Sequence, residues 1–227
     1  MSGTTELSTD GRREQVRVLI VDDHDLFRSG LRNLLEEEGV DVVAEGADGM
    51  EALRHVRELQ PDVVVMDLNM PGMGGVEATK RIASLAPLTR VLVLTISDQD
   101  GDVLDAILAG ACGYLLKDAS IQEVIHGIEA AAVGESLISP TIAHKVLERV
   151  RATSASPEAA ETIRAELSDR EIEVLKLIAN GNDNAHIAAE LHISPKTVKN
   201  HISNILMKLQ IENRIQAAVY AVRSGIV

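Results

Sequence analysis

The chain has 227 residues, ordinary hydrophobic content and a net charge of −13 at pH 7. No apolar run approaches the roughly 18 residues that a membrane-spanning helix requires, and the polar first fifteen residues lack the apolar segment of a signal peptide. The single cysteine, Cys112, excludes an internal disulfide and fits a reducing compartment. We therefore expect a cytoplasmic protein without a membrane partner, in which Cys112 is a small packing residue.

The charge is distributed unevenly along the chain. Residues 16–136 contain 9 Lys and Arg against 22 Asp and Glu, whereas residues 166–227 contain 7 of each. Two halves that differ so much in charge indicate two domains with different roles. Between them, residues 137–165 begin with an apolar-periodic segment and continue with a stretch rich in Ala, Ser and Glu, which predicts a linker that contains a helix. Residues 1–15 are interpreted as a disordered lead.

Strands and helices alternate through the first half. Apolar runs predict five strands, at 16–21, 40–45, 63–66, 90–95 and 113–116. Apolar residues at helical spacing predict five helices, at 24–38, 50–59, 75–85, 102–109 and 121–132. Because parallel strands need crossover connections, this alternation predicts an α/β fold with a five-stranded parallel sheet wrapped by helices.

The strand expected at 63–66 has four apolar side chains in succession and is followed by Asp67. Such a run is typical of a central strand that is buried on both faces. Pro71 and Gly72 then turn the chain, so Asp67 lies just past the carboxyl end of the strand. Open α/β sheets place their ligands at this edge. We therefore interpret Asp67 as a functional residue and not as a surface carboxylate.

Other strands also end on polar side chains. The first ends on Asp22 and Asp23, the fourth on Thr95 and the fifth on Lys117. Carboxyl ends of parallel strands lie at one edge of the sheet, so these side chains are expected to converge. Three carboxylates repel one another unless a cation lies among them, and Mg²⁺ is the most suitable hard divalent ion. Together with the ammonium and the hydroxyl group they form a site for a phosphoryl group, with Asp67 as its nucleophile.

These motifs resemble a known family. Four segments within residues 16–136 are similar to the signature motifs of bacterial response-regulator receiver domains. They are Asp22-Asp23, Asp67-Leu-Asn-Met-Pro-Gly, Leu94-Thr95 and Gly113-Tyr114-Leu-Leu-Lys117. The resemblance implies a flavodoxin-like fold and phosphorylation of Asp67 by a sensor histidine kinase. It also implies that Asp22, Asp23, Asp67 and the backbone carbonyl of Asn69 hold Mg²⁺. Lys117 would contact the phosphoryl oxygens, and Thr95 and Tyr114 would form a switch pair.

Two alternative functions share some or all of these motifs. A phosphatase of the haloacid-dehalogenase type also uses an aspartyl phosphate, but it needs a second carboxylate two residues later as general acid and base. Asn69 occupies that position, so we expect no enzymatic turnover. A regulator whose output ignores phosphorylation shares every motif, and the sequence leaves it open.

The second half predicts a small all-α helix-turn-helix domain. Ser168 and Glu171 form a capping box that starts one helix, Asp183 starts a short second helix, and Ser194-Pro195 starts a third that runs to about Leu209. Apart from its inward apolar stripe, the third helix is basic and rich in amides, with no acidic residue. Such a face fits the major groove of duplex DNA. The candidate contacts are Ser194, Lys196, Thr197, Lys199, Asn200, His201, Ser203, Asn204 and Lys208.

The segment from Leu167 to Gly225 resembles the LuxR-type domain of NarL/FixJ response regulators. The similar motifs are Leu-Ser-Asp-Arg-Glu from Leu167, Ile187-Ala188, Leu191-His-Ile-Ser194, Thr197-Val-Lys-Asn-His201 and Lys208-Leu209. The resemblance implies that the closing helix, Arg214 to Arg223, pairs two such domains on DNA. Val219 and Tyr220 are the candidate residues of that contact, and a plain core role for Val219 stays equally open. We therefore expect a two-component response regulator that is phosphorylated on Asp67 and binds duplex DNA as a phosphorylation-promoted homodimer.

Overall fold

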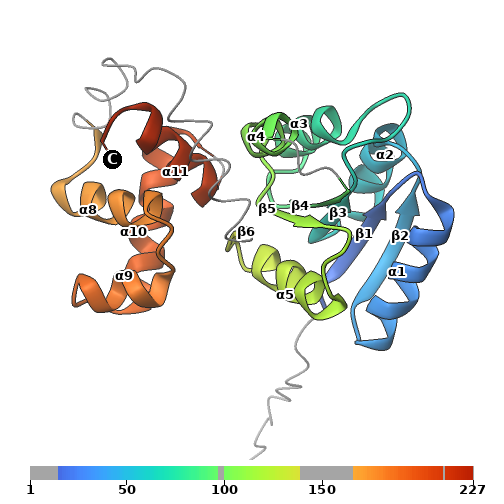
Figure 1. Ribbon diagram of the computed structural model, residues 1–227, viewed down its shortest axis with the longest axis horizontal. Helices are drawn as coiled ribbons and strands as arrows, with labels where there is room; N and C mark the ends of the chain where they lie inside the picture. Colours follow the sequence, from blue (N-terminus) through green and yellow to red (C-terminus); the bar gives the residue numbers. More distant parts are fainter. Residues whose placement is uncertain (1–14, 97–99, 139–165, 212, 227) are drawn as a thin grey trace, which may run out of the picture.

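A computed structural model describes residues 15–96, 100–138, 166–211 and 213–226. It contains a sheet covered by helices and, beside it, a bundle of four helices (Figure 1). The linker helix expected near residues 142–150 lies outside the described residues, as does most of the N-terminal lead.

The sheet is parallel, with the strand order β2-β1-β3-β4-β5-β6. The five expected strands are confirmed as β1 (Arg17–Val21), β2 (Asp41–Gly46), β3 (Val63–Met66), β4 (Arg90–Thr95) and β5 (Gly113–Leu116). The additional strand β6 (Leu137–Ile138) pairs with β5 at the edge. Two residues are too few to produce a periodic pattern, so β6 was not predicted from the sequence.

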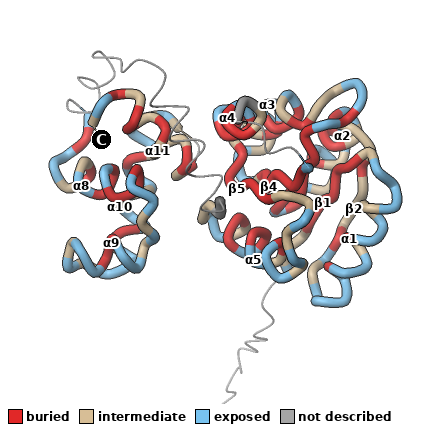
Figure 2. The backbone as a smooth tube through the Cα atoms, in the orientation of Figure 1, coloured by how far each residue is buried: buried red, intermediate tan, exposed pale blue. Residues whose placement is uncertain are grey.

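Helices cover both faces of the sheet. Their bounds are α1 (Asp25–Glu37), α2 (Gly49–Leu59), α3 (Gly75–Leu85), α4 (Asp100–Leu108) and α5 (Ile121–Ala132). Neighbouring residues of one strand enter opposite cores: Ile20 packs with α1 and α5, whereas Leu19 packs with α2 and α3. Both cores are buried (Figure 2), which explains why the central strands are apolar without alternation.

The second unit consists of α8 (Asp169–Ala179), α9 (Asn184–Glu190), α10 (Pro195–Leu209) and α11 (Arg214–Arg223). Ser168 and Glu171 form the expected capping box at the start of α8, and the Ser194 side chain caps α10 by accepting from the Thr197 amide. The core of this unit is apolar and contains Val174, Leu175, Ile187, Val198 and Ile205. The three expected helices and the closing helix are therefore confirmed.

Gly75 brings the start of α3 against the backbone of Asp67. A Cβ atom at this position would lie 2.0 Å from the Asp67 carbonyl oxygen and 2.8 Å from Leu68 Cα. Real structures do not tolerate such contacts, so only glycine fits here without a shift of the chain. The Gly75 amide also donates to the Leu68 carbonyl at 2.9 Å. This contact fixes the segment that follows β3.

We expect Gly75→Ala to destabilise the sheet unit by about 1–3 kcal/mol, because the added methyl group overpacks a rigid backbone contact. Urea unfolding monitored by circular dichroism measures this effect. Gly30→Ala is the matched control, since a Cβ in the middle of α1 meets nothing within 4 Å. Helix propensity predicts that this control is neutral or slightly stabilising. Equal stability of the two variants would contradict the steric role of Gly75.

Glu171 is a buried carboxylate that joins α8 to α10. It accepts hydrogen bonds from the Ser168 amide at 2.8 Å and from Lys208 Nζ at 2.7 Å. Burial alone would raise the pKa of Glu171, but the hydrogen bonds from Lys208 and Ser168 outweigh burial and lower its pKa below the usual 4.5. A carboxyl whose pKa is lowered by folding stabilises the fold above its unfolded pKa, and this contribution is lost as the pH falls through the lowered value.

Glu171→Gln should therefore lower the free energy of unfolding of the helical unit by about 1–3 kcal/mol at neutral pH. The difference from wild type should shrink as the pH falls below 4.5. Thermal unfolding between neutral and acidic pH measures both effects. Glu173→Gln is the control on the same helix, because Glu173 is exposed and pairs with Arg170 at the surface. A difference that stays constant across the acidic range would exclude the ionised Glu171 as its source.

Candidate functional site

Two buried carboxylates and one ammonium group meet at the carboxyl edge of the sheet. Lys117 Nζ lies 2.7 Å from Asp22 Oδ2 and 2.8 Å from Asp67 Oδ2. Both aspartates are only 2% exposed. The three residues follow β1, β3 and β5, so strand ends that are far apart in sequence converge as expected.

The two oxygens of Asp67 have different environments. Oδ1 accepts hydrogen bonds from the backbone amides of Leu68 at 2.7 Å and Asn69 at 3.4 Å, whereas Oδ2 faces Lys117. Burial alone would lower the pKa of Lys117, but its hydrogen bonds to Asp22 and Asp67 outweigh burial and raise its pKa above 10.5. Lys117 therefore stays charged at neutral pH. Its ammonium group also lies 4.7 Å from the centre of the Phe27 ring, a contact that the sequence did not predict.

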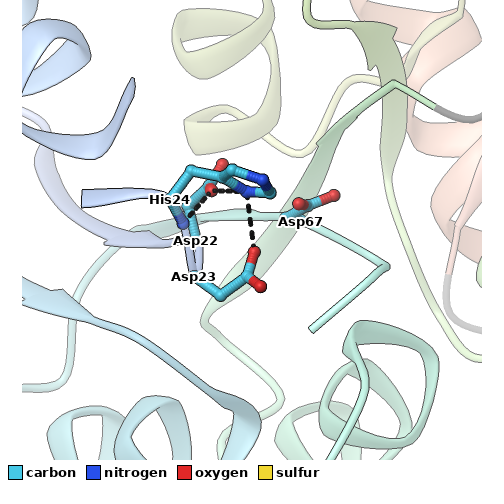
Figure 3. A group of neighbouring side chains, drawn as sticks. All are labelled: Asp22, Asp23, His24 and Asp67. Atoms are coloured by element: carbon cyan, nitrogen blue, oxygen red, sulfur yellow. Dashed lines mark hydrogen bonds and ion pairs between the residues drawn. The ribbon is translucent and has the colours of Figure 1, made fainter. Parts of the chain in front are cut away.

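Asp23 and His24 complete the rim of the pocket (Figure 3). His24 Nδ1 lies 2.8 Å from Asp23 Oδ1 and 3.4 Å from Asp22 Oδ1. One ligand atom from each of Asp22, Asp23, His24 and Asp67 can be chosen so that all four lie within 4.8 Å of one another. Sequence reasoning missed His24, although its position directly after the acidic pair was the available signal. A donor set dominated by carboxylate oxygens fits a hard divalent cation such as Mg²⁺.

The other expected residues of this pocket lie in different surroundings. Thr95 ends β4 and Tyr114 lies in the neighbouring strand β5, and both are fully buried. Asn69 is exposed, and its backbone amide lies next to Asp67. Tyr114 packs into an apolar cluster with Val103 and Ile107 of α4. The pocket is thus continuous with the packing of α4.

Most candidate DNA contacts lie on the exposed side of α10. Ser194, Lys196, Lys199, Asn200, Ser203, Asn204 and Lys208 are exposed, and Thr197 and His201 are partly buried. Thr197 Oγ1 lies 2.8 Å from Ser194 Oγ, so both hydroxyls belong to the helix cap. Lys208 already pairs with Glu171, and this pairing balances part of its charge.

The basic helix faces the sheet unit across a cavity of about 580 Å³ that Lys199 and Ser203 line. Lys199 Nζ lies 2.7 Å from Glu135 Oε1, and Glu135 follows α5. This ion pair is exposed and contributes little by itself. It nevertheless means that one candidate DNA contact is engaged by the other half of the chain.

The closing helix α11 packs against α4. Asn213 Nδ2 donates to the Ala111 carbonyl at 3.0 Å, and Gln216 Nε2 donates to the Ile107 carbonyl at 3.0 Å. Sequence reasoning missed both amides, because their partners are backbone carbonyls about a hundred residues away. Of the two expected dimerisation residues, Val219 is buried and Tyr220 is half-buried.

Among the described residues no helix is both long and apolar enough to cross a membrane. Two family models match the chain: the response regulator receiver domain over residues 18–129, and the LuxR family of bacterial regulatory proteins over residues 165–221. Together they cover both structural units.

Individual relatives agree with these matches. The transcriptional regulatory protein LiaR of Bacillus subtilis (strain 168) is 44% identical over 93% of this chain and 99% of its own length. A crystal structure of a LuxR-family two-component response regulator from Aurantimonas sp. SI85-9A1 is 42% identical, with a TM-score of 0.57, over 60% of this chain and 98% of that one.

A structure of two RcsB dimers bound to two parallel DNAs is 26% identical, with a TM-score of 0.55, over 93% of this chain and 99% of that one. The acidic pocket at the sheet edge, the basic helix and these matches over nearly the whole length agree with one another. The chain therefore belongs to the NarL/LuxR family of two-component response regulators, which regulate transcription through a receiver domain and a LuxR-type DNA-binding domain.

Proposed function

We propose that a sensor histidine kinase phosphorylates Asp67 and that this modification controls DNA binding by the helical unit. The observation that carries the proposal is the pairing at the sheet edge, where Lys117 bridges Asp22 and Asp67 at 2.7 and 2.8 Å. A buried carboxylate beside an ammonium group and a second carboxylate has the parts that phosphoryl transfer needs. We propose residues 16–136 as the receiver domain, 137–165 as the linker and 166–227 as the DNA-binding domain.

In this proposal, Asp67 Oδ2 attacks the phosphorus of a phosphohistidine. A new P–O bond forms, the P–N bond breaks, and the electron pair of that bond stays on the imidazole nitrogen, which takes up a proton. Oδ1 remains held by the Leu68 amide, so Oδ2 is the oxygen that becomes available once Lys117 moves from it. Lys117 then donates to a phosphoryl oxygen.

The acidic residues around Asp67 have a second role in the proposal. Asp22, Asp23 and Asp67, with the Asn69 carbonyl, would hold Mg²⁺, which when bound supplies positive charge to the phosphoryl oxygens. The clustering of these ligand atoms supports the assignment. Thr95 would move toward the phosphoryl group and Tyr114 would fill the space that it leaves. Both residues are buried, so this movement requires repacking beside α4.

The helix α10 would insert into the major groove of duplex DNA. Its exposed residues supply ammonium groups for phosphates and amides for base edges, and the residues proposed as contacts are Ser194, Lys196, Thr197, Lys199, Asn200, His201, Ser203, Asn204 and Lys208. Phosphorylated homodimers in the cytoplasm would pair through Val219 and Tyr220 of α11. The related RcsB is described as dimers bound to DNA, which supports this arrangement here.

Asp67→Asn should abolish acyl phosphate formation, because the amide is not a nucleophile. Phosphate-affinity electrophoresis after incubation with Mg²⁺ and acetyl phosphate measures the modification. Asp41→Asn, which removes an exposed carboxylate at the start of β2, is the control and should be phosphorylated as wild type. Sedimentation with and without beryllium fluoride then shows whether only chains with an intact Asp67 dimerise. An acyl phosphate on Asp67→Asn would refute the proposed phosphoacceptor.

Lys196→Ala and Lys199→Ala should each weaken binding to random-sequence duplex DNA and reduce its logarithmic salt dependence by about 1, since each lysine is proposed to contact one phosphate. Fluorescence anisotropy at several salt concentrations, on beryllium fluoride-treated protein, measures both quantities. Lys176→Ala is the control, because Lys176 is an exposed lysine on α8, outside the proposed interface. Equal salt dependence in all three variants would place the DNA surface elsewhere.

A further inference from the structure

Phe27 is the only phenylalanine of the chain, and it lies in the first turn of α1 beside the acidic pocket. It is partly buried and packs against an apolar cluster that contains Ile20, Leu94 and Val124. Packing alone gives no reason for an aromatic ring here, because a leucine would also fill an apolar position on this helix. The ring is distinguished by its contact with Lys117.

The Lys117 ammonium group is held between two carboxylates and this ring. Its Nζ atom lies 2.7 Å from Asp22 Oδ2, 2.8 Å from Asp67 Oδ2 and 4.7 Å from the centre of the Phe27 ring, over the ring face. The face of an aromatic ring carries negative potential and attracts a cation within about 6 Å. The Lys117 side chain is only 9% exposed, so little water competes for its charge.

The side of Lys117 that faces away from the carboxylates is apolar. Lys117 and Phe27 both line a cavity of about 310 Å³ between α1 and α5. Leu26, which is 89% exposed, lies at the rim of this cavity, so solvent can reach it. The described residues that line the cavity offer no side-chain hydrogen-bond acceptor. On this side the Phe27 ring is therefore the protein group that attracts the ammonium charge, in competition with water.

The two kinds of contact respond differently to phosphoryl transfer. In the proposed reaction Lys117 leaves Asp67 Oδ2 and donates to a phosphoryl oxygen, so a short hydrogen bond is broken before its replacement is complete. Attraction to a ring face needs no aligned N–H bond and persists while the ammonium group moves. The ring consequently contributes more during the exchange than before it. Only an interaction that strengthens on the way to the transition state accelerates a reaction.

We propose that Phe27 is a positioning residue for phosphoryl transfer to Asp67. The face of its ring holds the Lys117 ammonium group in the pocket while this group exchanges the Asp67 carboxylate for a phosphoryl oxygen. Phe27 acts through Lys117 and makes no contact of its own with the phosphoryl group. The inference rests on the proposed function, since it adds a residue to that reaction.

The electron density of the ring separates this role from simple packing. Because Phe27 is the only phenylalanine, fluorinated phenylalanine supplied during expression enters the full-length protein at this position alone. Rings with one, two or three fluorine atoms away from the Cβ attachment lose electron density from their faces in steps, with little change in shape. A packing role is insensitive to this series, whereas the attraction to Lys117 weakens along it.

The rate of Asp67 phosphorylation by acetyl phosphate with Mg²⁺ is measured on each protein by phosphate-affinity electrophoresis. We expect the rate to fall with each added fluorine atom. Phe27→Leu, which has no ring face, should react about twofold to thirtyfold more slowly than wild type. Phe27→Tyr keeps a ring face and should recover most of the rate. Urea unfolding checks that each protein is folded.

Leu31→Val is the control for packing. Leu31 is buried on the same helix and belongs to the same apolar cluster as Phe27. Shortening it should lower stability, because core atoms are removed, and should leave the phosphorylation rate unchanged. The contact itself is read by proton NMR, since the Phe27 ring current shifts the ε-methylene protons of Lys117 upfield. Phe27→Leu removes this shift, and the beryllium fluoride adduct of wild type should retain it.

Equal rates across the fluorinated series would overturn the positioning role even if Phe27→Leu reacted slowly, because lost packing would then explain that variant. Loss of the upfield shift in the beryllium fluoride adduct would also overturn it, since the ammonium group would have left the ring. If wild type forms no acyl phosphate, the proposed function is wrong and the role of Phe27 falls with it. If wild type, Leu31→Val and all fluorinated proteins react equally, the role of Phe27 alone is wrong.

Discussion

The structure depends on the charge balance at the carboxyl edge of the sheet. Asp22 and Asp67 are buried close together, and two such carboxylates coexist because the Lys117 ammonium group bridges them at 2.7 and 2.8 Å. Burying a charge without a partner is costly. A new charge on Asp67 would therefore require a rearrangement of its partners.

The carboxyl edge of the sheet is also connected to the packing of α4. Tyr114 lies in a buried cluster with α4, and the same cluster extends into α11 of the helical unit. A tightly packed interior cannot absorb a displaced aromatic ring by a small local adjustment. The receiver and the DNA-binding unit are thus joined by apolar contact as well as by the hydrogen bonds of Asn213 and Gln216. Polar bonds make the contact specific.

The two units also differ in charge. The receiver carries nearly all of the net negative charge, whereas the helical unit is neutral overall and gathers basic and amide side chains on α10. The ion pair of Lys199 with Glu135 brings the two surfaces together. Because this pair is exposed, salt and a competing phosphate backbone both weaken it. An acidic receiver can therefore cover the basic helix α10 without holding it firmly.

The sequence by itself determined the five main strands, their helices, the helix-turn-helix order and the convergence of Asp22, Asp67 and Lys117. These features follow from local periodicity and from the rule that parallel strands end at one edge. Only the tertiary structure decided that β6 extends the sheet, that Lys208 pairs with Glu171 and that α11 packs on α4. Such contacts join distant residues, often through backbone carbonyls, and a carbonyl has no signature in the sequence.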